Sequence, residues 1–158
     1  MKKTIAMRLL EGKKVKYEVM PYPAHMRDAE EIASELGISP ERLFKTLVVL
    51  PPGITGKAAK PILVMLPANK QLDLKSLAGQ LNTKKLKLAT HKEAEALTGL
   101  EVGGISALAL VNKGFAIYLD EAARIHEEIF VSAGQRGLDV KLAVIDLVKV
   151  TGASFVKV

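Results

Sequence analysis

The sequence predicts an α+β fold, in which a mixed, mostly antiparallel sheet, curled or closed into a β-barrel, is flanked by helices. Many short strands are predicted, and the predicted helices fall in groups instead of alternating with every strand. In one strand, Leu138, Val140 and Leu142 alternate with Asp139 and Lys141, so one face is buried and the other is polar. This alternation is typical of an antiparallel sheet.

The predicted helices have capping residues at their ends and an apolar stripe along one side. Asp73 can cap a helix that begins at Leu74, and Thr90 with Glu93 forms a capping box for a helix that Gly99 would end. Pro40, after a serine, suits the first turn of another helix. The predicted helices are 4–11, 28–36, 40–44, 74–81, 91–98 and 144–151.

Runs of β-branched and aliphatic residues predict the strands. A hairpin turn is predicted at 111–115, and the proline- and glycine-rich segment 51–57 predicts a hairpin-type connection with an exposed, mobile tip. The predicted strands are 15–20, 45–50, 61–67, 107–112, 115–119, 128–132, 138–143 and 154–157.

The 158 residues suit one domain, and no repeat or low-complexity tract divides them. Hydrophobic residues make up 49% of the chain but aromatic residues only 4%, so aliphatic side chains must build the core. The apolar runs are far shorter than the ~20 residues of a membrane-spanning helix, and the N-terminus lacks the apolar stretch of a secretory signal. We therefore expect a single-domain cytoplasmic protein without a membrane partner.

The composition also limits the chemistry. The chain has no cysteine, which excludes disulfides and a cysteine nucleophile. His25, His91 and His126 have no second ligand at a spacing that suits a metal, and no nucleotide-binding or serine-hydrolase motif occurs. We expect no metal and no cofactor.

The net charge is +6, and lysines cluster at 13, 14 and 16 and again at 84, 85 and 87. Phosphate is a plausible partner for such clusters. Neither cluster contains aromatic residues that could stack on bases, so the sequence does not indicate base-specific recognition of single strands. Taken singly, each cluster is better interpreted as a solvated basic surface.

Two segments suggest a ligand site. Lys45 lies in the apolar strand 44–50, where an ammonium is costly to bury unless an anionic or carbonyl group meets it. Gly103 and Gly104 allow backbone amides to approach a ligand closely. Ser132 and Asp139 bracket a turn that could bring two strand ends to one cleft. Each residue alone also has an ordinary structural interpretation, such as a strand-end lysine or a turn serine.

Together these segments resemble the YbaK/EbsC family. The resemblance rests on 44–49, 98–106 and 131–142, followed by Asp146, Leu147 and 151–153, in order and over nearly the whole chain. Family members are aminoacyl-tRNA deacylases that clear Cys-tRNA(Pro), and they are related to the editing domain of bacterial prolyl-tRNA synthetases. The resemblance implies one editing domain over residues 1–158, a mixed β-barrel with helices around it, and a pocket for the aminoacylated 3′ end of tRNA.

The resemblance also implies the site residues. Lys45 matches the key catalytic lysine, and the implied substrate-binding residues are Tyr22, Gly103, Gly104, Ser106, Ser132, Arg136 and Asp139. The implied reaction positions the substrate without a protein nucleophile, since the thiol of the bound cysteine is thought to attack its own ester. The implied partners are the 3′ end of aminoacyl-tRNA and prolyl-tRNA synthetase.

Two positions differ from the usual family pattern. Ala107 stands where the family usually has proline, and Asp28 lies where an aromatic residue is often found. Two alternatives therefore stay open. One is an Ala-tRNA(Pro) deacylase of the same superfamily, and the other is a non-catalytic module that binds tRNA ends or proteins.

Overall fold

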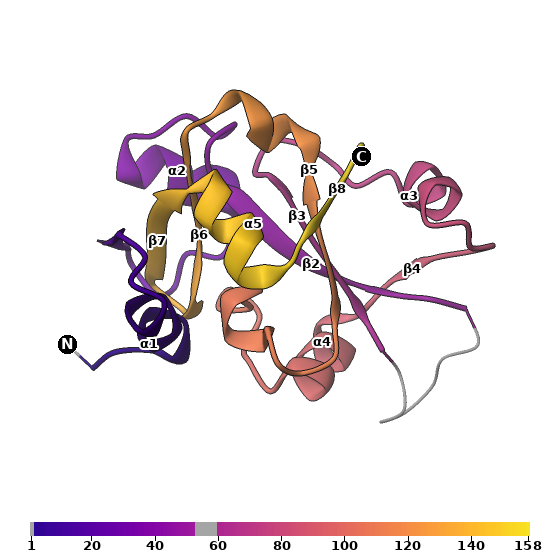
Figure 1. Cartoon of the computed structure of the whole chain (residues 1–158), viewed down its shortest axis with the longest axis horizontal. Helices are drawn as coiled ribbons and strands as arrows, with labels where there is room; N and C mark the ends of the chain where they lie inside the picture. Colours follow the sequence, from indigo (N-terminus) through magenta and orange to yellow (C-terminus); the bar gives the residue numbers. More distant parts are fainter. Residues whose placement is uncertain (1, 53–59) are drawn as a thin grey trace.

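The computed structural model describes residues 2–52 and 60–158, which form two sheets surrounded by helices (Figure 1). In the first sheet, β1 (Tyr17–Pro21), β7 (Leu138–Ala143) and β6 (Glu128–Gln135) lie in that order and pair antiparallel. The order in the second is β4 (Lys87–Leu88), β2 (Phe44–Leu50), β3 (Ile62–Pro67), β5 (Ala116–Asp120) and β8 (Ser154–Val156). In this sheet β4, β2 and β3 are antiparallel, whereas β3, β5 and β8 are parallel.

The helices begin and end near the predicted caps. Asp28, Asp73 and Thr90 each accept a backbone N–H in the first turn of a helix, and Gly37, Gly99 and Gly152 end three helices in the left-handed conformation. The helices are α1 (Ile5–Gly12), α2 (Ala29–Leu36), α3 (Leu74–Gln80), α4 (His91–Thr98) and α5 (Val144–Thr151). The α+β class is confirmed.

The predicted curled sheet or closed β-barrel is not found in the part of the chain that the structure describes. The two sheets meet at an isolated bridge between Leu43 and Phe130, where Phe130 N donates to the Arg42 carbonyl at 2.9 Å. Beyond it, the next strand contact on this edge of β2 is with β4, at Val49 and Leu50. The intervening residues 44–47 have no strand partner on that side among the described residues, so the hydrogen bonding does not continue around a barrel.

Two other predicted elements are wrong. Residues 40–42 form a turn instead of a helix, because the backbone of Arg42 and Leu43 bonds to Phe130 and to Ala68 rather than along a helix. Residues 107–112 are not a strand: Leu108–Leu110 is a short 3-10 helix, η2, whose Leu108 and Leu110 are buried and which contacts α1 and β6 without pairing in a sheet. The turn at 111–114 therefore joins no hairpin, and β5 pairs in parallel with β3 and β8.

Some elements of the structure were not predicted, and one predicted segment lies mostly outside the residues that the structure describes. The two-residue strand β4 and the 3-10 helix η3 (Glu121–Ile125) were not predicted, and β6 extends past its predicted end to Gln135. Most of the predicted connection 51–57 lies outside the described residues. No helix in the described part of the chain has the length and apolar character that a membrane span needs.

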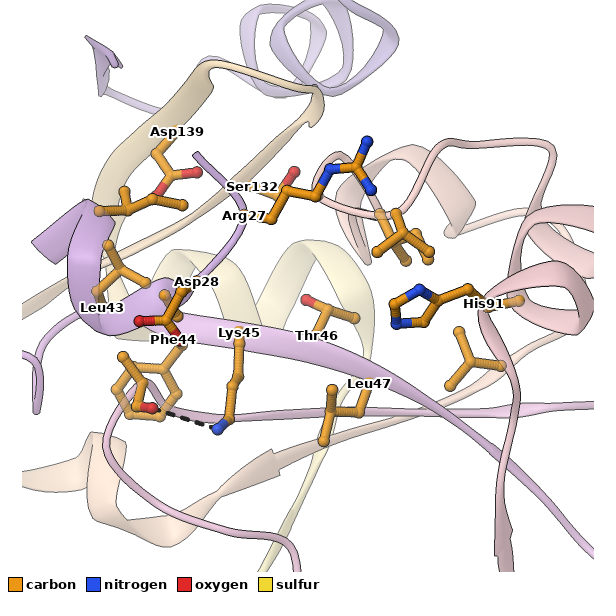
Figure 2. Close-up of a pocket in the computed structure, with 18 of the residues that line it drawn as sticks. Arg27, Asp28, Leu43, Phe44, Lys45, Thr46, Leu47, His91, Ser132 and Asp139 are labelled. Atoms are coloured by element: carbon orange, nitrogen blue, oxygen red, sulfur yellow. Dashed lines mark hydrogen bonds between the residues drawn. The ribbon is translucent and has the colours of Figure 1, made fainter. Parts of the chain in front are cut away.

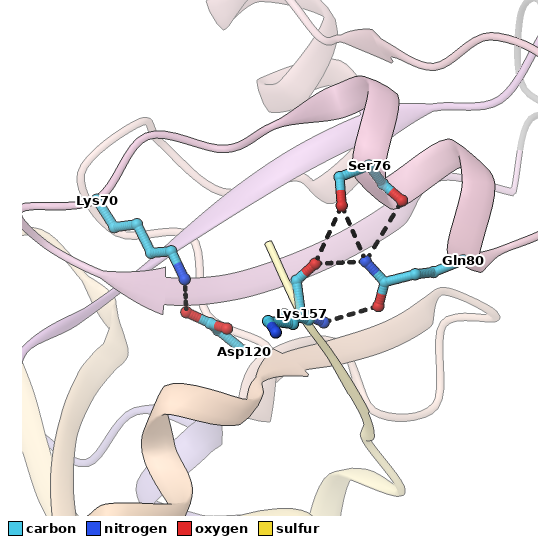
Figure 3. Close-up of polar contacts among 5 residues, drawn as sticks. All are labelled: Lys70, Ser76, Gln80, Asp120 and Lys157. Atoms are coloured by element: carbon cyan, nitrogen blue, oxygen red, sulfur yellow. Dashed lines mark hydrogen bonds and ion pairs between the residues drawn. The ribbon is translucent and has the colours of Figure 1, made fainter.

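Polar contacts tie the loops around β5 and β8 together (Figure 3). The Lys70 ammonium donates to the fully buried Asp120 carboxylate at 2.9 Å, which fixes the segment after β3 against the end of β5. Next to β8, Lys157 N donates to the Gln80 side-chain oxygen at 2.8 Å. The first contact matters for the site, because the segment that Lys70 holds includes Ala68.

Candidate active site

A pocket lies where the open edge of β2 faces α2, α4 and the β6–β7 hairpin. Its volume is about 300 Å³, and residues 44–48 of β2 line one wall. The carbonyls of Arg42 and Val48 both accept hydrogen bonds on this edge. Backbone groups of a strand alternate in direction, so those of Phe44 and Thr46 point into the same gap. The edge of β2 is thus open where a ligand can enter.

Lys45 lies in this pocket, as predicted, at the start of β2. Its ammonium donates to the Ala68 carbonyl at 3.2 Å, and the side chain is half-buried. Figure 2 shows Lys45 on one side of the pocket, with Ser132 and Asp139 on the other. The ammonium is held by a neutral carbonyl, not by a carboxylate, so its charge is available to a ligand.

Ser132 and Asp139 are opposite each other in the β6–β7 pairing, and both line the pocket. The prediction that the turn between them brings two strands to one cleft is confirmed. A shift in the pairing follows Ser132, whose hydroxyl accepts the Gly134 N–H at 3.1 Å. The bulge re-aims the end of β6 and leaves these two side chains together.

Asp139 is a buried acid, with only 4% of its surface exposed. Burial raises the pKa of Asp139 to about 7, because the charged carboxylate has lost its hydration. Tyr22 also lines the pocket, and burial, together with the nearby Asp139, raises its pKa to about 12. Tyr22 therefore acts as a neutral hydrogen-bond donor, while Asp139 changes its charge near neutral pH.

The glycine loop closes the pocket between α4 and the β6–β7 turn. Gly103 lines the cavity with a φ of +95°, and its carbonyl accepts the Tyr22 hydroxyl at 3.4 Å. Gly104, Ser106 and Arg136 do not line the pocket. Instead, the Arg136 Nε donates to the Val102 carbonyl at 3.2 Å, and its guanidinium pairs with Glu101. Arg136 thus holds the loop, whereas Gly104 and the buried Ser106 belong to the loop itself.

Gly104 allows the glycine loop to lie directly against the backbone of the β6–β7 turn. A Cβ at Gly104 would lie 2.8 Å from the backbone N of Arg136 and 3.0 Å from the carbonyl carbon of Gln135. We expect Gly104→Ala to destabilise the protein by about 1–3 kcal/mol, because backbone atoms cannot yield as a side chain does. Urea unfolding measures this.

Gly79 provides the control for this substitution. It lies within α3, and a Cβ there would meet nothing within 4 Å. Gly79→Ala should therefore stabilise the protein by about 0.5–1 kcal/mol. Similar unfolding midpoints for the two alanine variants would contradict the close packing of the glycine loop.

Four polar residues of the pocket were not among the predicted site residues: Arg27, Asp28, Thr46 and His91. The hydroxyl oxygen of Thr46 is shielded from solvent and has no hydrogen-bond partner among the described residues. For Thr46, the only signal in the sequence was its position next to Lys45. Arg27 lies in a loop and His91 begins α4, and only the fold brings these two residues to the pocket.

The two positions that differ from the family pattern take clear structural roles. Ala107 is buried and has a φ of −61°, which lies in the range that proline adopts. The loop thus holds this conformation without the proline ring. Asp28 caps α2 through the Glu31 N–H at 3.1 Å and lines the pocket, so this wall is polar.

The described residues contain no group of three or more histidine, cysteine, aspartate or glutamate side chains that could hold a metal ion. The polar groups that line the pocket are an ammonium, hydroxyls, a guanidinium, an imidazole, carboxyls and backbone groups. Such a set can bind and orient a polar ligand, and it includes no cysteine nucleophile.

Comparison with known proteins agrees with this site. Residues 23–150 match the aminoacyl-tRNA editing domain family. EbsC of Enterococcus faecalis, named as a candidate Cys-tRNA(Pro)/Cys-tRNA(Cys) deacylase, is 38% identical over 99% of this chain and 93% of its own length.

Two solved structures share the fold. The hypothetical protein APE2540 has a TM-score of 0.84 and 23% identity, with 98% of both chains covered. A candidate trans-editing enzyme for prolyl-tRNA synthetase has a TM-score of 0.75 and 23% identity, with 99% of this chain and 98% of that chain covered.

The fold and the pocket thus define an aminoacyl-tRNA editing domain. The chain belongs to this family, and the prediction of the YbaK/EbsC group from its sequence motifs is confirmed.

Proposed function

We propose that this protein is a trans-editing deacylase that removes the amino acid from mischarged tRNA, with Cys-tRNA(Pro) as its main substrate. The observation that carries the proposal is the convergence of Lys45, Tyr22, Gly103, Ser132 and Asp139, from separate segments of the chain, around one pocket. Similarity to EbsC supports cysteine as the amino acid, and the name of EbsC gives both proline tRNA and cysteine tRNA as carriers.

The pocket size supports an aminoacyl ester as the ligand. About 300 Å³ is at the lower end of the volumes of small-molecule sites. It suits an amino acid with the terminal ribose, whereas the preceding nucleotides stay outside. An aminoacyl ester is already activated, so the protein mainly has to position it and stabilise the charge that develops on its carbonyl oxygen.

We assign Lys45 to this carbonyl oxygen or to the terminal phosphate. Its ammonium now contacts the Ala68 carbonyl, a weaker partner than an oxyanion, so substrate can displace that contact. The backbone groups of Thr46 on the open β2 edge and the carboxyl of Asp139 would hold the amino group of the substrate. Tyr22 and Ser132 would shape the pocket around the ribose.

The thiol of cysteine would supply the nucleophile that the pocket lacks. In this step the sulfur bonds to the ester carbonyl carbon, the bond from that carbon to the ribose oxygen breaks, and the ribose oxygen takes the proton that the thiol gives up. The products are a cyclic thioester and deacylated tRNA. The protein contributes position and electrostatics, which agrees with a chain that contains no cysteine. We further propose that prolyl-tRNA synthetase presents the tRNA, because a small domain has few means of selecting one tRNA.

The choice of amino acid is tested with three substrates, Cys-tRNA(Pro), Ser-tRNA(Pro) and Ala-tRNA(Pro). We expect cysteine to be released at least about 100-fold faster than alanine, because alanine has no side-chain nucleophile and water is a poor replacement. Release of radiolabelled amino acid measures the rates.

Each other result has a distinct meaning. Equal rates for cysteine and alanine would mean that water attacks, and would favour the alanine-removing relative. Protection of all three esters would favour the non-catalytic binding module.

A further inference from the structure

Two lysine clusters occur in the sequence, and the fold places them differently with respect to the pocket. Lys84, Lys85 and Lys87 are exposed, and the chain that carries them leads directly into the pocket wall at Leu88, Ala89 and His91. Lys13, Lys14 and Lys16 are also exposed, but they follow α1. Figure 1 shows α1 and β4 at opposite sides of the molecule. The sequence alone could not separate these clusters.

We propose that Lys84, Lys85 and Lys87 form the surface that binds the phosphates of the tRNA acceptor end, and that they guide this end into the pocket. This inference rests on the proposed function, since it takes tRNA as the substrate of the same site. The pocket holds the aminoacyl ester, so the nucleotides before it must cross the rim. Each of those nucleotides carries a phosphate.

The charges around the rim support this assignment. Four acids near the rim each accept a hydrogen bond or ion pair from the protein, whereas Asp139 lies inside the pocket: Asp28 accepts from the Glu31 N–H, Glu93 from the Thr90 N–H, Glu95 from the Val102 N–H, and Glu101 pairs with Arg136. Lys87 also lies 3.7 Å from Glu93, in an exposed pair that is worth little in water. Lys84 and Lys85 make no ion pair within the described part of the chain, so their charge is directed to the solvent.

The shape of this segment also suits a nucleotide chain. From Lys84 to Ala89 the backbone can span at most about 17 Å, which is long enough to follow several nucleotides. Leu88 lies between the lysines and the pocket and is 46% exposed. An apolar side chain there can contact a ribose or a base, while the ammonium groups of the three lysines that precede it contact phosphates.

The test compares two triple variants that remove the same charge. Lys84→Gln/Lys85→Gln/Lys87→Gln and Lys13→Gln/Lys14→Gln/Lys16→Gln each lower the net charge from +6 to +3. Fluorescence anisotropy with deacylated tRNA(Pro), between about 50 and 200 mM KCl, measures binding without any need for catalysis. We expect the first variant to bind about 10–100-fold more weakly at low salt, with a log–log salt slope less steep by about 2.

The second variant should bind within about threefold of the wild type. Lys84→Arg/Lys85→Arg/Lys87→Arg should restore both affinity and slope, because arginine keeps the charge. With Cys-tRNA(Pro), the glutamine variant at positions 84, 85 and 87 should raise KM much more than it lowers kcat. Equal losses in the two glutamine variants would overturn the proposed surface and assign tRNA binding to overall charge. Salt-dependent tRNA binding without deacylation would overturn the proposed activity and leave the surface in place.

Discussion

Lys45→Ala is expected to reduce deacylation of Cys-tRNA(Pro) by at least about 10²–10³-fold, the usual loss when one donor to a developing oxyanion is removed. Lys45 lines the pocket, and its ammonium bonds to the backbone carbonyl of Ala68. Removing it therefore leaves no buried carboxylate uncompensated, and the thermal midpoint should fall by only a few degrees. Single-turnover rates at saturating protein measure the chemical step.

Matched variants separate the charge of Lys45 from its packing. Lys45→Met keeps an apolar stem of similar length and should lose as much activity as Lys45→Ala. Lys75→Ala removes an exposed lysine of α3 that does not line the pocket, and its rate should equal that of the wild type. If Lys45→Met retained the wild-type rate, the ammonium would have no part in the reaction.

Asp139→Asn is expected to change stability and activity in a pH-dependent manner. Burial raises the pKa of Asp139 in the fold from an ordinary value of 3.8 to about 7. A raised pKa means that the stability it contributes is present at low pH and is lost as the pH rises through 7. The asparagine variant does not titrate, so its stability relative to wild type should rise by about 3 kcal/mol from pH 5 to pH 8.

The activity of Asp139→Asn relative to the wild type should instead fall as the pH rises. Above pH 7 the ionised Asp139 can hold the ammonium of the amino acid, a charge-assisted hydrogen bond worth roughly 1.5–3 kcal/mol. Asp139→Asn should therefore lose about 10–100-fold in kcat/KM near pH 8, and much less near pH 5.5, where the wild-type carboxyl is also protonated. Asp146→Asn in the first turn of α5, outside the pocket, is the control. A constant ratio of wild type to Asp139→Asn across this range would exclude ionisation of Asp139 from substrate binding.

Local sequence signals predicted most of the fold, because they act over a few residues. The Thr90 and Glu93 capping box and the left-handed Gly99 define α4 as expected. The alternation in 138–143 defines a strand with one buried face. The failures have the opposite cause. Residues 40–44 and 107–112 are compatible with helix or strand locally. Distant Phe130 and Ala68 bond to the backbone of Arg42 and Leu43, whereas Leu108 and Leu110 are buried where η2 contacts α1 and β6.

The sequence by itself determined the α+β class, the family and the residue types of the site, since motifs and periodicity are properties of neighbouring residues. It also led to Lys45, Tyr22, Gly103, Ser132 and Asp139, all of which line the pocket. Only the tertiary structure decided that Gly104, Ser106 and Arg136 lie outside the pocket lining and that Arg136 holds the glycine loop through Val102 and Glu101. It also decided that the sheet stays open along β2 and that one of two similar lysine clusters borders the opening. These features depend on contacts between segments far apart in the chain, and composition and spacing do not encode such contacts.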